Sequence, residues 1–280
     1  MLTGFADWCL KHPYRMVSVI VALTLLPVGA FIAMALMSLV VLRYSAANAV
    51  LVVFTTIGMS LVAWWLNGSA LPMLFALQIL AMAEVLRRRT RWEDTLLVGA
   101  LIVAVASLFN SAMWVPEGLS VTDRASDTSV LSGLLGKEAS EEQARHVLGI
   151  MLCIATFLPS TLALMLARHW QAALFNAGGF QREFHAFKLT PLVTALAMVM
   201  MVLCMGSGLY AYAFLPMTIV VIAGAALVHG LVGQQSLSKM WLFGFYAVLS
   251  IQPLGIIIVS LLVVIDAFVD LRSRLTRSQH

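Results

Sequence analysis

Acidic side chains close to apolar runs are the first candidates for chemistry in this chain. Glu84 and Asp266 each lie near one end of a long apolar run. A carboxylate in apolar surroundings is costly unless it binds a cation, shares a proton or pairs with a basic side chain. Arg88 follows Glu84 by one helical turn, whereas Asp270 and Arg272 follow Asp266 within two turns. We therefore expect charge-paired helix ends, with contact to a substrate as the alternative.

A second set of candidates surrounds two tripeptides, Pro27-Val28-Gly29 and Pro253-Leu254-Gly255, which interrupt the apolar runs 16–42 and 241–269. Proline removes a backbone hydrogen bond and glycine loosens the backbone, so each run should kink or reverse. Paired breaks of this kind point to the substrate site in transporters. Alternatively, proline kinks and hydrogen bonds between helices explain the same residues without a ligand. The predicted ligand-binding set is Pro27, Gly29, Gln78, Asn110, Gln252, Pro253 and Gly255.

Segment 168–188 combines aromatic, polar and basic side chains between two apolar runs. Trp170, Leu174 and Phe175 recur at helical spacing, and the glycines that follow can take positive φ and end the helix. The pattern predicts an amphipathic elbow that joins two membrane helices, or a docking surface for a protein partner. The predicted partner-binding residues are Trp170, Phe175, Asn176, Gly178, Gly179, Phe180 and Arg182.

Signatures of enzymes and of metal sites are absent from the sequence. It contains no His-Glu-x-x-His and no Gly-x-Ser-x-Gly motif, and Ser140 with Gln143 is typical of a helix start. Cys9, Cys153 and Cys204 form no CxxC pair, and the histidines share no ligand spacing. We expect no enzymatic activity, no metal and no other cofactor.

Composition indicates which elements must position these residues. Hydrophobic residues make up 61% of the 280 residues and charged residues 11%, against roughly 45–50% and about 25% in soluble domains. A bilayer accepts apolar side chains on every outward face, whereas a soluble fold does not. We therefore predict an all-α polytopic membrane protein. The net charge of +4 is concentrated in short segments between apolar runs, which indicates topology signals rather than nucleic-acid binding.

Charge also predicts the topology. Basic residues accumulate in cytoplasmic loops, and the cluster between Arg87 and Arg91 is the strongest such signal. With this cluster inside, the other basic loops also lie inside only if the runs 16–42 and 241–269 turn back as hairpins. The prediction is a bundle of six full spans plus two broken hairpins in a bacterial inner membrane, with both termini cytoplasmic. The six spans are residues 48–66, 70–86, 95–114, 147–167, 188–208 and 213–233.

The chain is expected to form a single integral membrane domain over residues 1–280. Four segments of it lie outside the spans. They are an interfacial N-terminal segment at 1–15, a net negative external loop at 115–145, the cytoplasmic amphipathic loop at 168–188 and a basic cytoplasmic tail at 270–280.

Two stretches carry a resemblance to a known family. The first is Leu166-Ala167-Arg168-x-Trp170-Gln171-x-x-Leu174-x-Asn176-x-Gly178-Gly179-Phe180-x-x-Glu183-Phe184, and the second is Asp266-x-x-x-Asp270-x-Arg272. They resemble the YybS-like family of predicted bacterial inner-membrane proteins, which is distantly similar to the substrate-binding S components of energy-coupling-factor vitamin transporters. The Ala-x-x-x-Ala signature of S components is not evident; Ser18-x-x-x-Ala22 is the nearest small-residue pair.

Two functions compete at this point. The resemblance implies that the protein binds or transports a small molecule, at a site between the two broken hairpins. The residues alone also suggest a membrane-embedded interaction or scaffold protein, which binds a protein partner or anionic lipid through segment 168–188 and its basic tail. In both cases the lipid bilayer is the expected environment.

Overall fold

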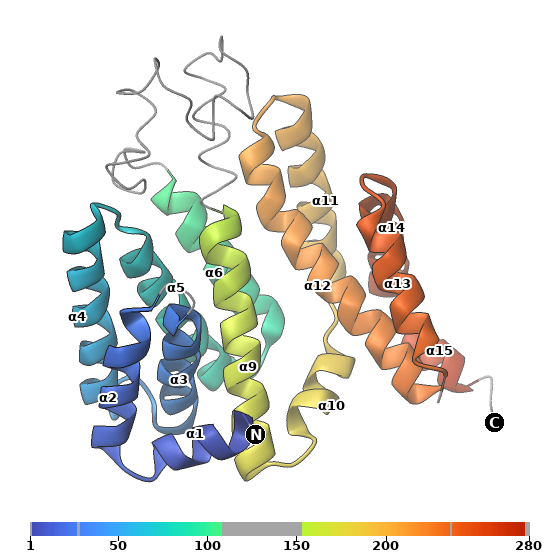
Figure 1. The fold of residues 1–280 in the computed structure, drawn as a ribbon. Helices are drawn as coiled ribbons and strands as arrows, with labels where there is room; N and C mark the ends of the chain where they lie inside the picture. Colours follow the sequence, from blue (N-terminus) through green and yellow to red (C-terminus); the bar gives the residue numbers. More distant parts are fainter. Residues whose placement is uncertain (1, 27–28, 108–152, 236, 278–280) are drawn as a thin grey trace.

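The computed structural model describes residues 2–26, 29–107, 153–235 and 237–277. Over these residues the secondary structure consists of thirteen α-helices and one π-helical turn, without a strand, so the all-α prediction is confirmed. Pro27, Asn110 and the expected external loop at 115–145 lie outside the described residues. Figure 1 shows most helices running along a common direction, with α1 (Leu2–Leu10) across one end of the bundle.

The centre of the first half of the bundle is α3 (Gly29–Tyr44). Every residue from Ala33 to Leu42 is buried, so the helix is enclosed on all sides. A helix that is apolar all round must be covered by lipid or by protein, and here protein covers it. Its neighbours are α2 (Pro13–Thr24), α4 (Val50–Asn67), α5 (Leu71–Arg89) and α9 (Leu158–Phe175).

The second half is built around α12 (Tyr210–Gln234), a helix of 25 residues. At 1.5 Å per residue its length is about 37 Å, enough to cross a hydrocarbon core of about 30 Å. Gly224 allows α14 (Leu254–Val269) to approach closely, because a Cβ there would lie 2.4 Å from Val259 Cγ1. The helices packed against α12 are α10 (Gly179–Ala186), α11 (Pro191–Gly206), α13 (Met240–Ser250), α14 (Leu254–Val269) and α15 (Leu271–Arg277). It also contacts α6 (Trp92–Ala106) and the π-helical turn η2 (Cys153–Phe157).

Each apolar run with a Pro-x-Gly break forms two helices. The first run separates into α2 and α3 and the second into α13 and α14, and in Figure 1 each pair doubles back on itself. The four helices have 12, 16, 11 and 16 residues. Their lengths of roughly 16–24 Å fall short of the hydrocarbon core of about 30 Å.

Glycine is required at both breaks by the closeness of the backbone. A Cβ on Gly29 would lie 2.1 Å from the carbonyl oxygen of Leu23. A Cβ on Gly255 would lie 2.3 Å from the carbonyl oxygen of Val248. Both contacts are with backbone atoms of the preceding helix, so a larger residue would push the paired helices apart.

Two described helices are long and apolar enough to cross a membrane, Val50–Asn67 and Tyr212–Gln234. A third candidate combines α10 with α11, which are bent by 67° at their junction. The helix α5 has 19 residues, but Glu84 and three arginines occupy its last turns. Several shorter apolar helices accompany these candidates, namely α2, α3, α13 and α14.

The N-terminus differs in detail from the expected interfacial segment at 1–15. α2 begins at Pro13, before the apolar run starts, because proline fits the first turn of a helix. α1 rests on the bundle with Ala6 and Cys9 fully buried, and Trp8 stays 46% exposed. Arg15 places its guanidinium 5.0 Å from the centre of the Trp8 ring.

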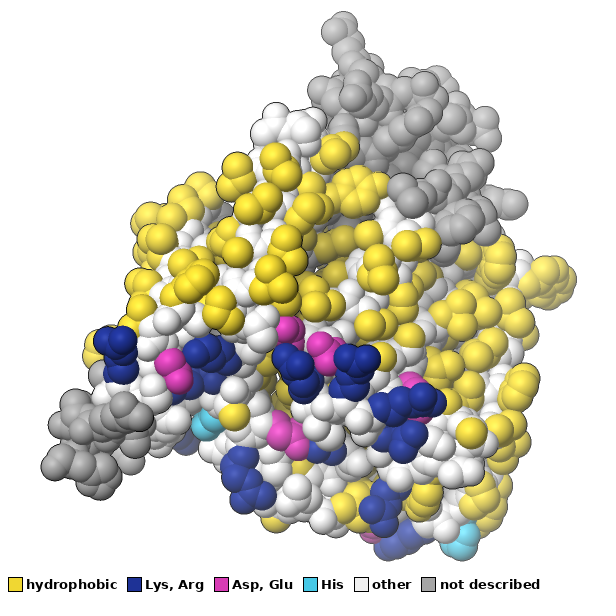
Figure 2. Space-filling model, turned by 180° about the vertical axis from the view of Figure 1, so that it is seen from behind, with side chains coloured by type: hydrophobic (Ala, Val, Ile, Leu, Met, Phe, Trp, Pro, Cys, Tyr) yellow, Lys and Arg dark blue, Asp and Glu magenta, His cyan; other side chains and the backbone are white. Residues whose placement is uncertain are grey.

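Charged side chains gather at one end of the molecule. Figure 2 shows lysine, arginine and acidic side chains in a band below a wide hydrophobic surface. Hydrogen bonds connect the segments of this end to one another: Gln171 with Leu42, Thr190 with Glu93, and Arg272 with His185. We call residues 42–46, 84–94, 168–190, 229–235, 237–239 and 266–274 the polar end. The basic loops that the charge count groups on one side of the membrane thus share one end of the fold.

Candidate functional site

The helix α10 is the organising element of the polar end. As the sequence predicts, the preceding helix stops before the glycines: α9 ends at Phe175 and Gly178 takes φ 76. Gly179 then begins α10, at a place where a Cβ would lie 2.5 Å from the Asn176 side chain. The chain therefore turns sharply, and α10 packs on both α9 and α12.

Polar side chains connect the C-terminal end of α9 to its neighbours. Arg168 forms an ion pair with Glu183 of α10, with Nε 2.8 Å from Oε2. Gln171 donates a hydrogen bond of 3.1 Å to the carbonyl of Leu42. The Arg43 guanidinium lies 4.2 Å from the centre of the Phe175 ring. The last two turns of α9 are thus anchored to the end of α3.

Aromatic rings of α10 contact each other and Trp92 of α6. Phe180 stacks on Phe184 at 5.8 Å and meets Trp92 edge-on at 6.1 Å. Trp170, expected at a docking surface, is fully buried. The physical reason is that α9 turns this side toward the bundle, together with Ala163 and Ala167.

The other predicted partner-binding residues differ in exposure. Phe175 is 47% exposed, and Asn176, Gly178 and Arg182 are also at the surface. Gly179 is buried and Phe180 is half-buried. The accessible part of the predicted docking surface is therefore the turn between the two helices rather than their aromatic side.

Glycines of α12 bring it close to the end of α10. A Cβ on Gly230 would lie 2.8 Å from the carbonyl oxygen of His185, and one on Gly233 would lie 2.8 Å from Cε1 of its ring. The His185 and His229 rings are 6.5 Å apart, and His229 Nε2 lies 3.0 Å from the hydroxyl of Tyr246. Burial, together with the charge of Arg272, lowers the pKa of His185 below 6.5.

The linker between α10 and α11 is held from two sides. Arg272 of α15 donates hydrogen bonds of 2.8 Å to the carbonyls of both His185 and Phe187, and lies 3.6 Å from Asp266. On the other side, buried Glu93 accepts hydrogen bonds from the amide of Thr190 at 2.7 Å and from its hydroxyl at 3.0 Å. The bend between α10 and α11 is thereby tied to both halves of the bundle.

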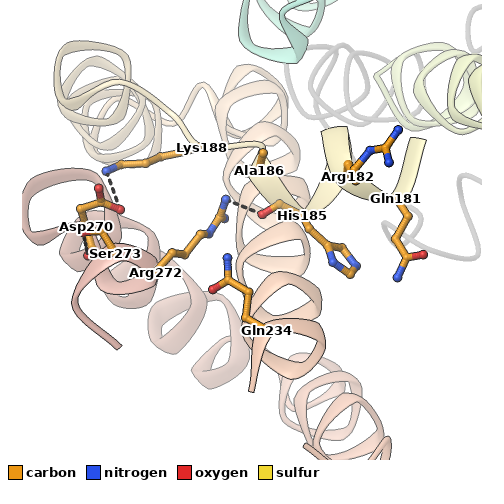
Figure 3. A pocket seen from close by; sticks show the side chains of 9 residues that line it. All are labelled: Gln181, Arg182, His185, Ala186, Lys188, Gln234, Asp270, Arg272 and Ser273. Carbon is orange, nitrogen blue, oxygen red and sulfur yellow. Dashed lines mark hydrogen bonds and ion pairs between the residues drawn. The ribbon is translucent and has the colours of Figure 1, made fainter. Parts of the chain in front are cut away.

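A pocket of about 750 Å³ lies beside this linker, between α10, α12 and α15 (Figure 3). Lys188 and Asp270 form an ion pair of 3.5 Å on one wall. Burial of the Asp270 carboxyl opposes ionisation, but Ser273 and Lys188 outweigh it and lower its pKa below 3.8. The lining residues are Gln181, Arg182, His185, Ala186, Lys188, Gln234, Asp270, Arg272 and Ser273.

The acidic residues expected at charge-paired helix ends have basic neighbours. Glu84 forms ion pairs with Arg87 at 2.9 Å and Arg88 at 2.7 Å, and accepts a hydrogen bond from the amide of Ala46. Asp266 accepts a hydrogen bond of 3.2 Å from the amide of Leu271, beside Arg272. These contacts join helix ends to the loops that follow or face them.

The described members of the predicted ligand-binding set lie in two different halves of the bundle. α3, which starts at Gly29, packs on α2, α4, α5 and α9, whereas α14, which holds Gly255, packs on helices of the other half (Figure 1). Gln78 is buried and hydrogen-bonded to Gly99 and Ser160, each at 3.1 Å.

At the second break, Gln252 is exposed and donates to the carbonyl of Leu249, and its peptide bond to Pro253 is cis. Gln78 and Gln252 thus form hydrogen bonds with neighbouring residues of the fold.

Sequence reasoning did not single out four residues of the polar end: Glu93, His185, Lys188 and Gln234. Glu93 follows a run of arginines in the sequence, and in the fold it binds Thr190, which lies 97 positions further along the chain. One sequence signal could have indicated that another segment packs closely on α12. Gly230 and Gly233 lie on one turn of this apolar helix, and two glycines there permit a close neighbour.

Comparison of the chain with protein-family models, with curated proteins and with solved structures found no match. Within the described ranges, no group of three or more histidine, cysteine, aspartate or glutamate residues is placed to hold a metal ion. The polar end itself provides ion pairs and hydrogen-bond donors, among them Arg168, Lys188 and Arg272.

Proposed function

We propose that the protein is an integral protein of the bacterial inner membrane, with six full spans, two broken hairpins and the polar end in the cytoplasm. The gathering of the basic segments at one end supports this topology, because basic loops favour the cytoplasmic side. The exposed apolar surface above that end matches the contact expected with lipid chains.

Within this setting we propose that the protein is a membrane-embedded interaction protein that binds anionic lipid headgroups at its polar end. The observation that carries the proposal is the band of basic side chains directly beside the apolar surface (Figure 2). Arg88 and Arg89 have side chains 70% and 71% exposed, available to headgroups despite their acidic neighbours. A basic residue near an anionic membrane surface gains about 1 kcal/mol.

Native mass spectrometry of the protein released from mixed phosphatidylglycerol and phosphatidylcholine nanodiscs tests this function. We expect retained lipid to be enriched in phosphatidylglycerol, and the Arg88→Gln/Arg89→Gln variant to lose most of that enrichment. The matched control is Arg124→Gln/Lys137→Gln, in the predicted external loop outside the described residues. Equal enrichment in the wild type and the arginine variant would contradict the proposal.

Small-molecule binding or transport, implied by the resemblance to S components, is a second candidate. The observation that favours it is that both Pro-x-Gly runs consist of two short paired helices. The same spectra test it, because a transported ligand should appear as a small bound mass that Gln252→Ala removes. Spectra without such a mass, recorded after purification at several detergent concentrations, would count against transport.

A further inference from the structure

The pocket beside the α10–α11 linker has an excess of positive charge. Three of its lining side chains are basic, Arg182, Lys188 and Arg272, and one is acidic, Asp270. The acidic side chain is already engaged by Lys188 at 3.5 Å. Asp266 lies 3.6 Å from Arg272, so three basic side chains face two acidic ones, and an anion that approaches the pocket meets a net charge of +1.

The wall also supplies donors in fixed positions. The two carbonyls that Arg272 contacts hold its guanidinium in place, so the charge needs no reordering when a ligand binds. Figure 3 shows the Gln234 amide and the Arg272 guanidinium turned toward the same space, with the His185 ring beside them. Arg182 stands at the rim, and in this view it is directed away from the space.

Phosphate fits this set of groups better than a carboxylate does. A phosphate group offers several strongly accepting oxygens, and therefore can use ammonium, guanidinium and amide donors from different walls at once. A volume of about 750 Å³ leaves room for such a group together with the atoms that carry it. The pocket lies at the polar end, at the level where lipid headgroups are expected under the proposed function.

We propose that this pocket binds the phosphate group of a phosphomonoester, with Lys188 and Gln234 as its principal donors and Arg272 as a fixed charge behind them. The inference rests on the proposed binding of anionic headgroups and names the group and the residues. The phosphate has two possible sources, a lipid headgroup such as phosphatidic acid or a soluble phosphate, and the experiment separates them.

The test measures binding in two arms with the full-length protein. Inorganic phosphate is titrated into protein in phosphatidylcholine nanodiscs, and phosphatidic acid is offered in mixed nanodiscs with retention read by native mass spectrometry. In at least one arm, Lys188→Gln should weaken binding about tenfold, because it removes a charged hydrogen-bond donor. Binding in the first arm identifies a soluble phosphate as sufficient, and binding in the second alone identifies a lipid.

Asp270→Asn is the complementary variant. It removes the competing carboxylate and frees Lys188, so phosphate should bind about threefold more tightly. Asparagine tolerates the left-handed backbone of this position, φ 55, so the helix end should persist. Because this variant predicts a gain, misfolding cannot imitate the expected result.

Lys239→Gln is the matched control, a basic residue of the polar end outside the pocket lining. It should leave phosphate binding unchanged. The proposed phosphate site is contradicted if neither arm shows binding. It is also contradicted if Lys239→Gln weakens phosphate binding as much as Lys188→Gln does, or if Asp270→Asn does not strengthen it. If phosphatidylglycerol enrichment still depends on Arg88 and Arg89 in that event, only the pocket fails; if the enrichment is lost as well, the proposed function fails with it.

Discussion

At the scale of single residues, the linker between α10 and α11 depends on two buried charged side chains from distant parts of the chain. Glu93 contacts Thr190 from the start of α6, and Arg272 contacts His185 and Phe187 from α15. Each satisfies backbone or hydroxyl groups that a helix end leaves open. Removal of one partner leaves the other unpaired in a buried place, which is the costly case for a hydrogen bond.

Glu93→Ala should therefore destabilise the protein by roughly 2–3 kcal/mol, the size expected for hydrogen bonds to a buried charge. Thermal unfolding in detergent measures the change. Asp7→Ala is the control, because the Asp7 side chain is 47% exposed and pairs with Lys11 at the surface. Its effect should stay within about 0.5 kcal/mol, and equal effects of the two variants would refute the role assigned to Glu93.

His185 should make stability depend on pH. Its pKa is lowered in the fold by burial and by Arg272, so the unfolded chain binds a proton more readily. The stabilising contribution is present above pH 6.5, the ordinary value, and is lost as pH falls through the lower value of the folded state. His229 of α12 and Arg272 of α15 face the same ring.

The measurement is the melting temperature between pH 5 and 8, compared between wild type and His185→Gln. The variant should lose part of the decline that the wild type shows on acidification. A decline of the same size in both would assign it to other groups.

Local sequence rules predicted the backbone conformation of single residues better than they predicted which neighbours surround a side chain. Gly178 was expected to take positive φ, and it does, because the rule concerns its own backbone. Helical spacing predicted that Trp170 lies on the apolar face of its helix, but spacing cannot say which neighbour covers that face. In the fold the rest of the bundle covers it, and Trp170 is buried. Glu93 is bonded to a residue 97 positions away, a distance that no local pattern contains.

At the scale of elements, the contact between α10 and α12 depends on the absence of side chains. Gly230→Ala would place a Cβ 2.8 Å from the backbone oxygen of His185, so α10 would have to move away. We expect a loss of about 1–3 kcal/mol, typical of overpacking, and with it a wider pocket. Thermal unfolding measures the loss.

Gly244→Ala provides the comparison within another apolar helix. A Cβ on Gly244 meets nothing within 4 Å, so the better helix propensity of alanine should leave stability unchanged or raise it by up to about 1 kcal/mol. If both substitutions have the same effect, the glycines of α12 do not serve the approach of α10.

Elements were predictable where proline and glycine mark them. Both Pro-x-Gly breaks separate two helices, and the glycines after Asn176 separate α9 from α10. The position of the two breaks relative to each other was not predictable. Hydropathy indicates that a helix lies in apolar surroundings, but it does not indicate which other helix packs against it. Packing placed Gly29 and Gly255 in different halves of the bundle.

At the scale of the whole molecule, the topology predicts which positions react from each side of a membrane. In a variant whose three cysteines are replaced by alanine, single cysteines at Arg88 and Ser207 should be labelled from opposite sides. Arg88 lies at the polar end, whereas Ser207 lies between α11 and α12 at the far end of those helices (Figure 1).

The measurement is labelling by a membrane-impermeant maleimide in whole cells and in inverted vesicles. Ser207→Cys should react in cells and Arg88→Cys only in inverted vesicles. Labelling of both positions from the same side would disprove the proposed orientation of these helices.

Composition predicted an all-helical chain, and charge predicted that the basic loops share one end. Composition and charge distribution are each summed over many residues, so predictions made from them do not depend on any single contact. The polar pocket could not be predicted in the same way, because α10, α12 and α15 contribute its lining and come together only in the fold.

The enclosure of α3 has a consequence for assembly during synthesis. A ribosome completes α3 more than a hundred residues before α9, one of the helices that cover it. In the proposed membrane setting, that side of α3 faces lipid until then. Apolar residues on all sides of α3 are therefore needed while the chain is still being synthesised. Polar substitutions on the side that faces α9 should impair membrane insertion before they affect the finished protein.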